Sequence, residues 1–592
     1  MSVHPALACA PLFADMPPEV IESLSRQAEE LRLDCGQPLY AQGDASSDVY
    51  LLISGRLRVT RNQRLIGYIG RLEPIGEMGV LSDDARDSDV YALRDSLLLR
   101  IPGTVFVAQM HACGPALMGL TRLILARLRE YRRKRRRSST EGHGVFAILP
   151  DSPGVPTSLL AEALIRRLGG WPRARLISAR HVDAALGTGA AQSTFERGAD
   201  NRRMLAWLDD LESRHDYLIL VADNDHDLWA QPCLRQADRV LILAEADQQP
   251  TGVPALQALP GKKLLAPLEL VMLRPQGDPS PYTLAWREVL DARAHYFVHP
   301  WDEDDMQSLA RQLTGRGIGL VLGGGGARGF AHIGLIRALN ELQIPVDIMS
   351  GTSMGAFVSA LLACGYDHVE MAQIARETFV NNNYLNDYTW PKVSLIRGQR
   401  FLTRLREIFG DREIENLHRT YYCMSTNLST GAAVMHVTGP LAVWVGTSMS
   451  VPGVAPPVAF EGELLCDGGV VDNLPTGSMQ RMERGLILAS SVSAHGDIRA
   501  PNAGMGAADP GALLDWHSAT RRPSFREILM RTATLTADTV IAVEAGQRAD
   551  IMLNMPVQEY GMFDWKSMDK LIECGYEHAL QMLTPQREVL VA

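Results

Sequence analysis

Short apolar runs alternate with stretches of helical periodicity in the second half of the chain. Residues 318–322 form an apolar run of strand length, and apolar side chains within 331–342 recur at helical spacing. The pattern then repeats, with a predicted strand at residues 346–349 and a predicted apolar helix at 354–364. These segments predict one βαβ unit with a right-handed crossover between parallel strands.

A glycine-rich loop and a Gly-X-Ser-X-Gly motif occupy the two strand-to-helix junctions of this unit. The first junction reads GGGGARG at residues 323–329, and consecutive glycines leave their backbone amides unobstructed. The second reads GTSMG around Ser353, which fits a nucleophile elbow, a sharp turn that exposes the serine hydroxyl. We therefore predict Ser353 as a nucleophile. The amides predicted to stabilise an oxyanion at the helix N-terminus belong to Gly324, Gly325 and Gly326.

Glycine-rich loops also bind dinucleotides or nucleotide phosphates, but this chain lacks the residues that either ligand requires. A dinucleotide fingerprint requires an acidic residue at ribose distance, and none stands out. A phosphate loop requires Gly-Lys-Ser/Thr, which does not follow residues 323–329. The pairing of the two glycine motifs in one βαβ unit therefore favours acyl transfer.

A serine nucleophile needs a base, and the loop DGGVVDN at residues 467–473 offers two carboxylates. Asp467 and Asp472 lie in the same loop, so composition alone does not choose between them. Ser448 repeats the Gly-Thr-Ser-Met pattern but lacks the closing glycine, and a proline follows, so we predict a structural role. His332, on the first turn of the predicted helix, is expected to be a packed or capping histidine.

The motifs GGGGARG, GTSMG and DGG, in this order, resemble those of the patatin-like phospholipases. The resemblance implies a three-layer α/β/α hydrolase domain over residues 317–592 and a catalytic dyad of Ser353 and Asp467 without histidine. It also implies that the glycine loop forms the oxyanion hole, braced by Arg328. One residue departs from the family pattern: Gly323 stands where patatins often have an aspartate.

Residues 12–137 read as short strands with glycine turns followed by a helix, which predicts a β-roll. Within it, PIGEMGVLSDDARDSDVYAL at 74–93 resembles the phosphate-binding cassette of cyclic-nucleotide-binding domains. The resemblance implies that Glu77 holds the ribose hydroxyl and Arg86 the cyclic phosphate. However, Asp87 and Asp89 bring carboxylates near that phosphate, which opposes binding. A nucleotide site and a β-roll retained for docking or regulation therefore both stay open.

Residues 144–299 contain four apolar strands that alternate with helical stretches, which predicts a second, smaller α/β domain. Its opening, LPDSPGVPTS at 149–158, stands where a phosphate loop would lie but has no lysine, so we expect no nucleotide hydrolysis. The layout resembles a degenerate ParA- or MinD-type nucleotide-binding fold. The whole domain order, and PCLRQADRVLIL at 232–243, resemble the neuropathy target esterase group of lysophospholipases, which implies hydrolysis of lysophospholipid or phospholipid acyl esters.

The distribution of charge and cysteine along the chain indicates which partners and which cellular compartment to expect. The net charge is −10, yet residues 132–137 are six consecutive basic residues. We expect this run to meet anionic lipid headgroups at a membrane surface, and not nucleic acid, because it lacks aromatic interleaving. Eight scattered cysteines suit a reducing compartment and predict neither a disulfide framework nor a metal site. No cofactor is expected.

The sequence predicts no secretory signal and no transmembrane helix, so we expect a cytoplasmic protein that attaches peripherally to the inner face of the membrane. Two rival functions stay open: a membrane-docked scaffold with an inert hydrolase domain, and a carboxylesterase for water-soluble esters. Residues 378–398, rich in asparagine and interrupted by a proline, are expected to form an irregular, mobile cover over the acyl pocket.

Overall fold

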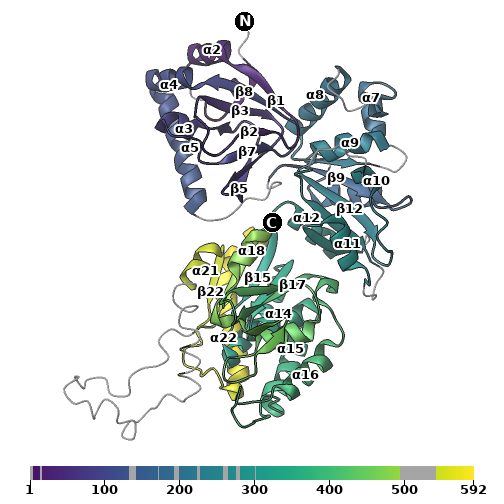
Figure 1. The fold of residues 1–592 in the computed structure, drawn as a ribbon, viewed down its shortest axis with the longest axis vertical. Helices are drawn as coiled ribbons and strands as arrows, with labels where there is room; N and C mark the ends of the chain where they lie inside the picture. The colour runs from purple at the N-terminus through teal and green to yellow at the C-terminus, as the bar shows by residue number, and fades with distance from the viewer. Residues whose placement is uncertain are drawn as a thin grey trace, which may run out of the picture. The chain divides into compact units, whose positions relative to one another are not determined.

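In the computed structural model, the chain forms two compact units, residues 1–316 and 317–592 (Figure 1). The structure describes residues 4–13, 16–132, 142–170, 172–192, 199–222, 227–257, 264–274, 280–299, 302–493, 528, 532 and 542–591. Most of the basic run at 132–137 lies outside these residues.

The first unit opens with a β-roll of two four-stranded antiparallel sheets. In one sheet the strands follow the order β1 (Glu29–Leu33), β8 (Ser96–Pro102), β3 (Asp48–Ser54) and β6 (Pro74–Ile75). In the other the order is β2 (Pro38–Tyr40), β7 (Asp89–Ala92), β4 (Leu57–Arg61) and β5 (Arg64–Ile69). The helices among the described residues are the short α1 (Pro5–Cys9), α2 (Pro18–Gln27), the short α3 (Glu77–Ser82), α4 (Gly103–Ala112) and α5 (Gly114–Arg132). This confirms the β-roll and terminal helix that the sequence predicts.

The rest of the first unit is a six-stranded parallel sheet. Its strands follow the order β10 (Ala174–Ser178), β11 (Tyr217–Val221), β9 (Gly144–Pro150), β12 (Arg239–Glu245), β13 (Leu268–Leu273) and β14 (Ala294–Val298). The four inner strands are almost wholly apolar because helices cover both faces of the sheet. Only these four strands were predicted, since the edge strands β10 and β14 interrupt their apolar residues with Arg175 and His295.

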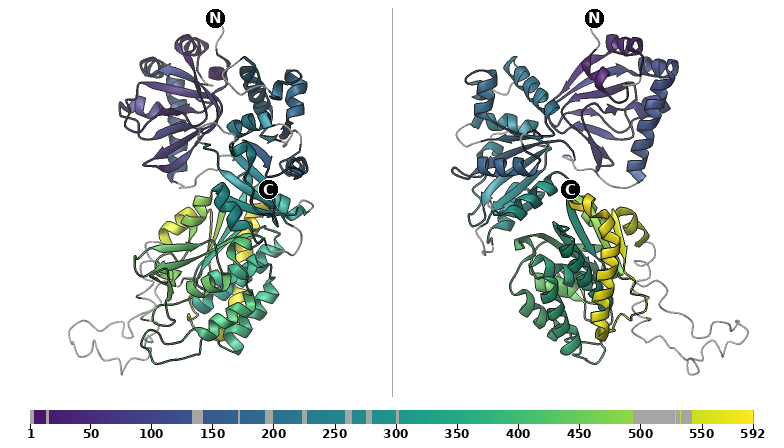
Figure 2. Two further views of the ribbon diagram at one scale, coloured as in Figure 1. Left: turned by 45° about the vertical axis from the view of Figure 1, so that its right-hand side comes forward. Right: turned by 180° about the vertical axis from the view of Figure 1, so that it is seen from behind.

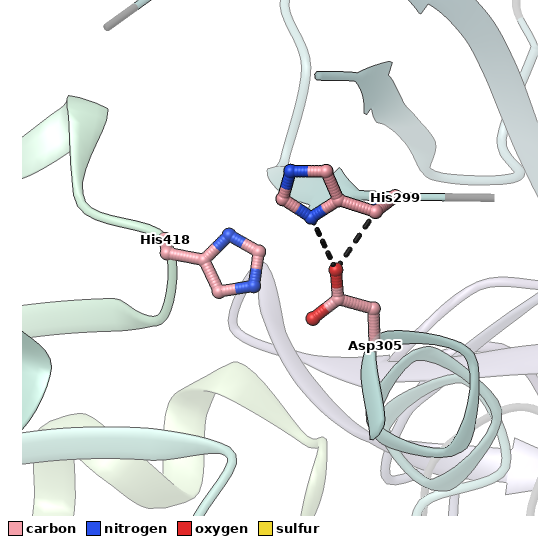
Figure 3. A group of neighbouring side chains, drawn as sticks. All are labelled: His299, Asp305 and His418. Atoms are coloured by element: carbon pink, nitrogen blue, oxygen red, sulfur yellow. Dashed lines mark hydrogen bonds and ion pairs between the residues drawn. The ribbon is translucent and has the colours of Figure 1, made fainter. Parts of the chain in front are cut away.

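A carboxylate ties the last strand of this sheet to the helix that follows. Asp305 lies in the first turn of α12 (Glu303–Leu313), and its Oδ2 accepts hydrogen bonds from the backbone N of His299 at 3.0 Å (Figure 3). The Nδ1 of the same histidine lies 2.9 Å from this oxygen. Asp302 caps the helix by accepting from the Asp305 amide at 2.9 Å.

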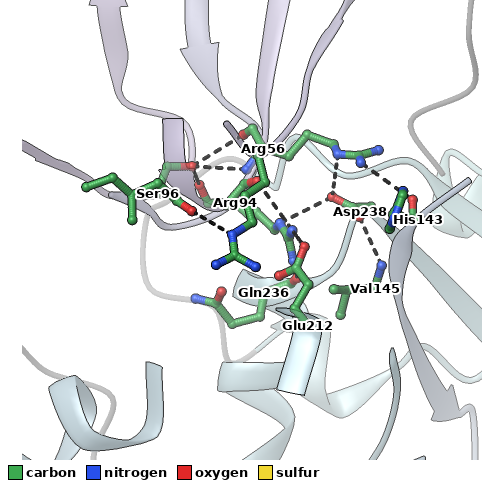
Figure 4. Close-up of polar contacts among 11 residues, drawn as sticks. Arg56, Arg94, Ser96, His143, Val145, Glu212, Gln236 and Asp238 are labelled. Carbon is green, nitrogen blue, oxygen red and sulfur yellow. Dashed lines mark hydrogen bonds and ion pairs between the residues drawn. The ribbon is translucent and has the colours of Figure 1, made fainter. Parts of the chain in front are cut away.

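A buried charge network joins the β-roll to the α/β domain within the first unit (Figure 4). Arg94, between β7 and β8, lies with its Nε 3.3 Å from Oδ1 of the fully buried Asp238. The same guanidinium pairs with Glu212 and donates to the Gln236 carbonyl at 3.2 Å. Asp238 in turn accepts from the Val145 amide at 2.9 Å. Removing one partner of such a network would leave a buried charge without compensation, so single substitutions within it should be strongly destabilising.

The second unit is built on a single mixed sheet in the order β19-β20-β17-β16-β15-β21-β22, with β18 (Ala433–His436) paired to β17. The parallel strands are β22 (Ile551–Asn554), β21 (Gly485–Ser491), β15 (Gly317–Leu322), β16 (Ile348–Thr352) and β17 (Thr420–Asn427). The antiparallel strands β20 (Glu463–Asp467) and β19 (Val458–Phe460) extend the sheet on one side.

Helices cover both faces of this sheet, as the expected α/β/α arrangement requires. One core joins the sheet to α13 (Ala331–Glu341), α14 (Met354–Ala363) and α22 (Met568–Leu583), and a smaller one joins it to α18 (Thr476–Met482) and α21 (Ala542–Arg548). The long helix α22, yellow in Figure 2, packs on α13. A Cβ at Gly334 would lie 2.0 Å from the Ile572 carbonyl, so glycine allows this close approach.

The second strand of the predicted βαβ unit extends further than the sequence indicates. It was predicted at 346–349 but runs as Ile348–Thr352, directly up to Ser353. Ser350, Gly351 and Thr352 are small or polar, so apolar periodicity stops before the strand does. Pairing with β15 and β17 on both sides continues the strand and buries these residues.

Candidate active site

Ser353 occupies a sharp turn between β16 and α14. Its backbone lies at φ 54° and ψ −122°, a conformation that is costly for a residue with a side chain. Its flanking glycines make the turn sterically feasible: a Cβ at Gly351 would lie 2.3 Å from the carbonyl carbon of Gly355. A Cβ at Gly355 would lie 2.1 Å from the Leu322 carbonyl oxygen. The turn therefore has the geometry of a nucleophile elbow.

The structure brings Asp467 to Ser353, and not Asp472. The Ser353 hydroxyl donates a hydrogen bond of 2.7 Å to Oδ2 of Asp467, at the end of β20. The other carboxylate oxygen accepts from the Gly469 amide at 2.8 Å, which fixes the orientation of the side chain. Asp472 contributes its backbone carbonyl, which accepts from the Thr352 hydroxyl at 2.9 Å. Of the two carboxylates that the sequence leaves open, Asp467 is therefore the one that bonds to the Ser353 hydroxyl.

Burial changes the acidity of Asp467. The side chain is only 5% exposed, and desolvation raises the pKa of its carboxyl group to about 6. The hydrogen bonds from Ser353 and Gly469 act in the opposite direction, because they favour the charged form. A carboxyl group with this pKa is ionised at neutral pH and is a stronger base than an exposed aspartate.

The glycine loop faces the same serine. A Cβ at Gly324 would lie 2.9 Å from Cβ of Ser353. The Gly324 amide donates to Oδ1 of Asn473 at 3.0 Å, so this predicted oxyanion donor is already engaged. The amides of Gly325 and Gly326 donate to no described residue; Gly325 precedes the 3₁₀ turn Gly326–Phe330, and Gly326 is its first residue. Of the three predicted amides, these two are therefore the ones available to an oxyanion.

Asn473 links the aspartate loop to the glycine loop, which sequence reasoning did not foresee. Its Nδ2 donates to the Gly324 carbonyl at 3.2 Å while its Oδ1 accepts from the amide of the same residue. Nδ2 also donates to the Ser493 hydroxyl at 3.2 Å. Two bonds to one glycine fix the orientation of its peptide groups. The only signal in the sequence was an asparagine placed six residues after Asp467.

The side chain of His332 is hydrogen-bonded to the first residue of the glycine loop. The ring is fully buried, with Nε2 2.8 Å from the Gly323 carbonyl and Nδ1 3.1 Å from the Ser490 hydroxyl. Burial lowers the pKa of His332 to about 4, so the ring is neutral at pH 7. We assign the proton to Nε2, which donates to the carbonyl, while Nδ1 accepts from the serine. Both ring nitrogens of His332 thus have partners other than Ser353, consistent with the packed histidine that the sequence predicts.

Ser448 supports the elbow instead of acting as a second nucleophile. It ends α17 (Leu441–Ser448), is fully buried, and its hydroxyl accepts from the Ser353 backbone amide at 3.0 Å. Two residues further on, the Ser450 carbonyl accepts from the Asp467 amide at 2.9 Å. The structural role predicted for Ser448 is thus to accept a hydrogen bond from the backbone of the elbow. Arg328, expected to brace the glycine loop, is buried within the 3₁₀ turn that follows it.

The cassette of the β-roll places Arg86 against its own backbone. Arg86 is buried, and its guanidinium donates to the carbonyls of Gly76 at 2.8 Å and Asp48 at 2.6 Å. It also lies over the ring of Tyr40, 4.3 Å from the centroid. Glu77, the predicted ribose ligand, is buried at the start of α3. The two carbonyls engage both terminal nitrogens of Arg86, whereas its buried Nε makes no hydrogen bond to a described residue.

The α/β domain carries carboxylates at the carboxyl ends of two neighbouring strands, β9 and β12. Asp151 follows β9, is buried, and desolvation raises the pKa of its carboxyl group. Glu245, at the end of the neighbouring β12, also has a raised pKa, from its partial burial and from the nearby Asp247 and Asp151. Carboxylates at this edge of the sheet repel phosphate, so the residues present do not suit a nucleotide triphosphate.

No helix among the described residues is long and apolar enough to cross a membrane. Three family models match the chain. A cyclic nucleotide-binding domain matches residues 30–112, a neuropathy target esterase family P-loop-like domain matches 144–307, and a patatin-like phospholipase matches 320–479.

Known relatives match nearly the whole chain. Lysophospholipase NTE1 of Chaetomium globosum is 29% identical over 98% of this chain and 44% of its own length. Patatin-like phospholipase domain-containing protein 7 of Rattus norvegicus is 30% identical over 93% of this chain and 45% of its own length. The chain thus spans less than half the length of these relatives. The chain thus carries a cyclic nucleotide-binding, a neuropathy target esterase P-loop-like and a patatin-like phospholipase domain in this order, and along nearly its whole length it is similar to patatin-like phospholipases of the neuropathy target esterase group.

Proposed function

We propose that the chain hydrolyses the acyl ester bond of lysophospholipids or phospholipids, with Ser353 as nucleophile and Asp467 as its base. The observation that carries the proposal is the 2.7 Å hydrogen bond between these two side chains at a strained elbow. The match to the patatin-like phospholipases and the names of the relatives support a lipid ester as the substrate.

In the first half of the reaction, the Asp467 carboxylate accepts the proton of the Ser353 hydroxyl as the oxygen attacks the acyl carbonyl. The amides of Gly325 and Gly326 donate hydrogen bonds to the resulting oxyanion. The intermediate collapses, and the departing glycerol oxygen takes the proton from Asp467. A fatty acyl group is then left on Ser353.

In the second half, water attacks the acyl-enzyme and gives a proton to Asp467. Collapse of this intermediate releases the fatty acid, and the proton returns to Ser353. The neutral His332 takes no proton in this scheme, because its acceptor nitrogen faces Ser490.

The proposal is tested by measuring fatty-acid release from lysophosphatidylcholine micelles and hydrolysis of a short-chain chromogenic ester by the intact protein. We expect both activities, with a higher kcat/KM for the long-chain lipid. Activity on the short ester alone would favour a general carboxylesterase. A folded protein without either activity would instead be a scaffold with an inert hydrolase domain.

The pH dependence of kcat/KM should follow Asp467. The reaction requires the carboxylate, and burial raises the pKa of this group to about 6. We therefore expect kcat/KM to be constant above pH 7 and to fall about tenfold per pH unit well below the pKa. A rate profile of the free enzyme on the short-chain ester measures this directly. A profile governed by a group near pH 4, or by no group at all, would contradict the assigned base.

Replacing Asn473 by alanine should lower kcat by about 10²-fold with little change in KM, because the glycine amides lose their fixed orientation toward the oxyanion. Asn473→Asp retains an acceptor for the Gly324 amide but loses the donor to its carbonyl, so an intermediate loss is expected. Steady-state kinetics on both variants separates the two parameters. A rise in KM at unchanged kcat would place Asn473 in substrate binding instead.

The β-roll, with Arg86 bound to its own backbone, is proposed to serve docking or regulation of the hydrolase domain. Cyclic nucleotide remains the ligand that its family match suggests.

A further inference from the structure

A loop of the hydrolase domain, residues 387–398, exposes three large side chains with apolar surface. We call it the Trp390 loop. Trp390 is 82% exposed, Val393 68% and Tyr388 56%. Most indole rings are at least partly covered in folded proteins, because their apolar area is large. An indole this exposed, with two apolar neighbours in one loop, indicates a surface that becomes covered by something else.

The Trp390 loop is held in a defined shape. Tyr388 and Ile396 form an antiparallel bridge, the Thr389 amide donates to the Leu395 carbonyl at 3.0 Å, and Arg397 donates to the Asp387 carbonyl at 3.0 Å. The expectation that residues 378–398 lack regular structure is also wrong at their start, where residues Arg376–Asn381 form a π-helix. The three exposed side chains are therefore presented by a fixed base and do not belong to a structureless segment.

The base of the Trp390 loop is bonded to the segment that precedes the catalytic aspartate. The amides of Leu395 and Ile396 each donate at 3.0 Å, to the carbonyls of Gly453 and Val454 respectively. This segment begins at Ser450, whose carbonyl accepts from the Asp467 amide. These hydrogen bonds thus link the base of the loop, through this segment, to Asp467.

The charges of the Trp390 loop are one-sided. Lys392 and Arg397 are exposed, whereas the one acid, Asp387, turns its carboxylate to the amides of Gly398 and Arg400 at 3.2 and 3.3 Å. An exposed tryptophan and tyrosine beside basic residues match the boundary of a bilayer with anionic lipids. Aromatic rings there lie at the headgroup level, and basic side chains reach the phosphates.

We propose that the Trp390 loop is the site by which the hydrolase domain docks on an anionic phospholipid surface, with Trp390 and Val393 inserted and Lys392 at the headgroups. The inference draws its biological purpose from the proposed lipid hydrolysis, but its binding test does not require hydrolysis. It also assigns an attachment point separate from the basic run at 132–137.

The test measures sedimentation of the full chain with vesicles of phosphatidylcholine alone or mixed with phosphatidylglycerol. The background variant is Ser353→Ala, which prevents lipid breakdown during the measurement. We expect the protein to bind more strongly to vesicles that contain phosphatidylglycerol, and Trp390→Ser to lower the affinity roughly tenfold. High salt should weaken the binding of the parent protein, and Lys392→Glu should weaken it in the same way at low salt. Val369→Ser is the matched control and should bind normally. Val369 is 61% exposed and lies in the helix His368–Ala375 of the same domain, outside the Trp390 loop.

A second measurement separates docking from catalysis. With Ser353 intact, Trp390→Ser should hydrolyse the short-chain ester at the normal rate and lose activity only on vesicles. The docking inference is overturned if the parent protein does not bind vesicles, or if Trp390→Ser binds as well as Val369→Ser. It is also overturned if Trp390→Ser loses short-ester hydrolysis, because the loop would then act on the reaction itself. Failure of the proposed hydrolysis would appear separately, as an inactive protein that still binds vesicles.

Discussion

Replacing Ser353 by alanine should lower the rate of acyl-ester hydrolysis by about 10⁴-fold or more, on both lysophosphatidylcholine and a short-chain ester. The serine oxygen forms the acyl-enzyme in the proposed reaction, and alanine has no atom to replace it. The substitution should not disturb the fold, because among the described residues the hydroxyl that it removes bonds to Asp467 alone. Initial rates measured with a protein of unchanged thermal unfolding would check this expectation.

Asp467→Asn should lower the rate of acyl-ester hydrolysis by about 10³- to 10⁴-fold, since asparagine keeps the shape of the side chain but does not accept the proton. Its stability separates this loss from misfolding. The pKa of Asp467 is raised from 3.8 to about 6 by folding, so the stability that this raised pKa provides at low pH is lost as pH rises from about 4 through 6. At pH 7 the buried charge opposes folding, and the neutral asparagine should be at least as stable as aspartate.

Ser448→Ala is the matched control for both substitutions. It removes a buried hydroxyl that accepts from the Ser353 amide, so we expect a loss of about tenfold and no more. If Ser448→Ala proved as damaging as Ser353→Ala while the protein stayed folded, the nucleophile would have been assigned to the wrong Gly-Thr-Ser-Met motif.

Gly355→Ala should destabilise the hydrolase domain by more than about 4 kcal/mol. The added Cβ would lie 2.1 Å from the Leu322 carbonyl oxygen and 2.8 Å from that of Gly323. Both are backbone atoms of the strand and loop that form the site, so neither can move away without disrupting the elbow. Calorimetry of the full chain should show one transition shifted strongly downward or lost, and the variant should be inactive.

Gly546→Ala is the control for this substitution. Gly546 lies in helix α21 of the same domain, and its added Cβ would meet nothing within 4 Å. Alanine favours a helix over glycine by up to about 1 kcal/mol, so unfolding should be unchanged or slightly delayed. A Gly355→Ala protein as stable and active as Gly546→Ala would show that the elbow is less constrained than its geometry indicates.

The sequence predicted the elements of the site better than their connections. The βαβ unit, the glycine loop and Ser353 could be predicted because each depends on residue types that few other structures require. Composition left the choice between Asp467 and Asp472 open, and only the family resemblance indicated Asp467. The two carboxylates lie five residues apart, and the antiparallel pairing of β20 with β17 brings Asp467 to the serine.

The structural role of Ser448 and the packing of His332 were predicted, but the specific contacts of Asn473, Ser448 and His332 were not, because each is made with a backbone group of another segment. Asn473 bonds to Gly324 across 149 positions of sequence, and Ser448 to the Ser353 amide across 95. For the same reason the engagement of the Gly324 amide was missed, although the glycine loop itself was recognised. Apolar periodicity likewise ended the strand before Ser353 too early, because its last residues are small and polar yet buried.

The most direct test of the account is to identify the residue that becomes acylated. The intact protein is treated with a fluorophosphonate, which reacts with activated serine nucleophiles, and the modified peptide is located by mass spectrometry. We predict one adduct, on Ser353, that forms more slowly by orders of magnitude in Asp467→Asn and at the normal rate in Val369→Ser. An adduct on Ser448, or no adduct on the folded protein, would contradict the Ser353–Asp467 dyad.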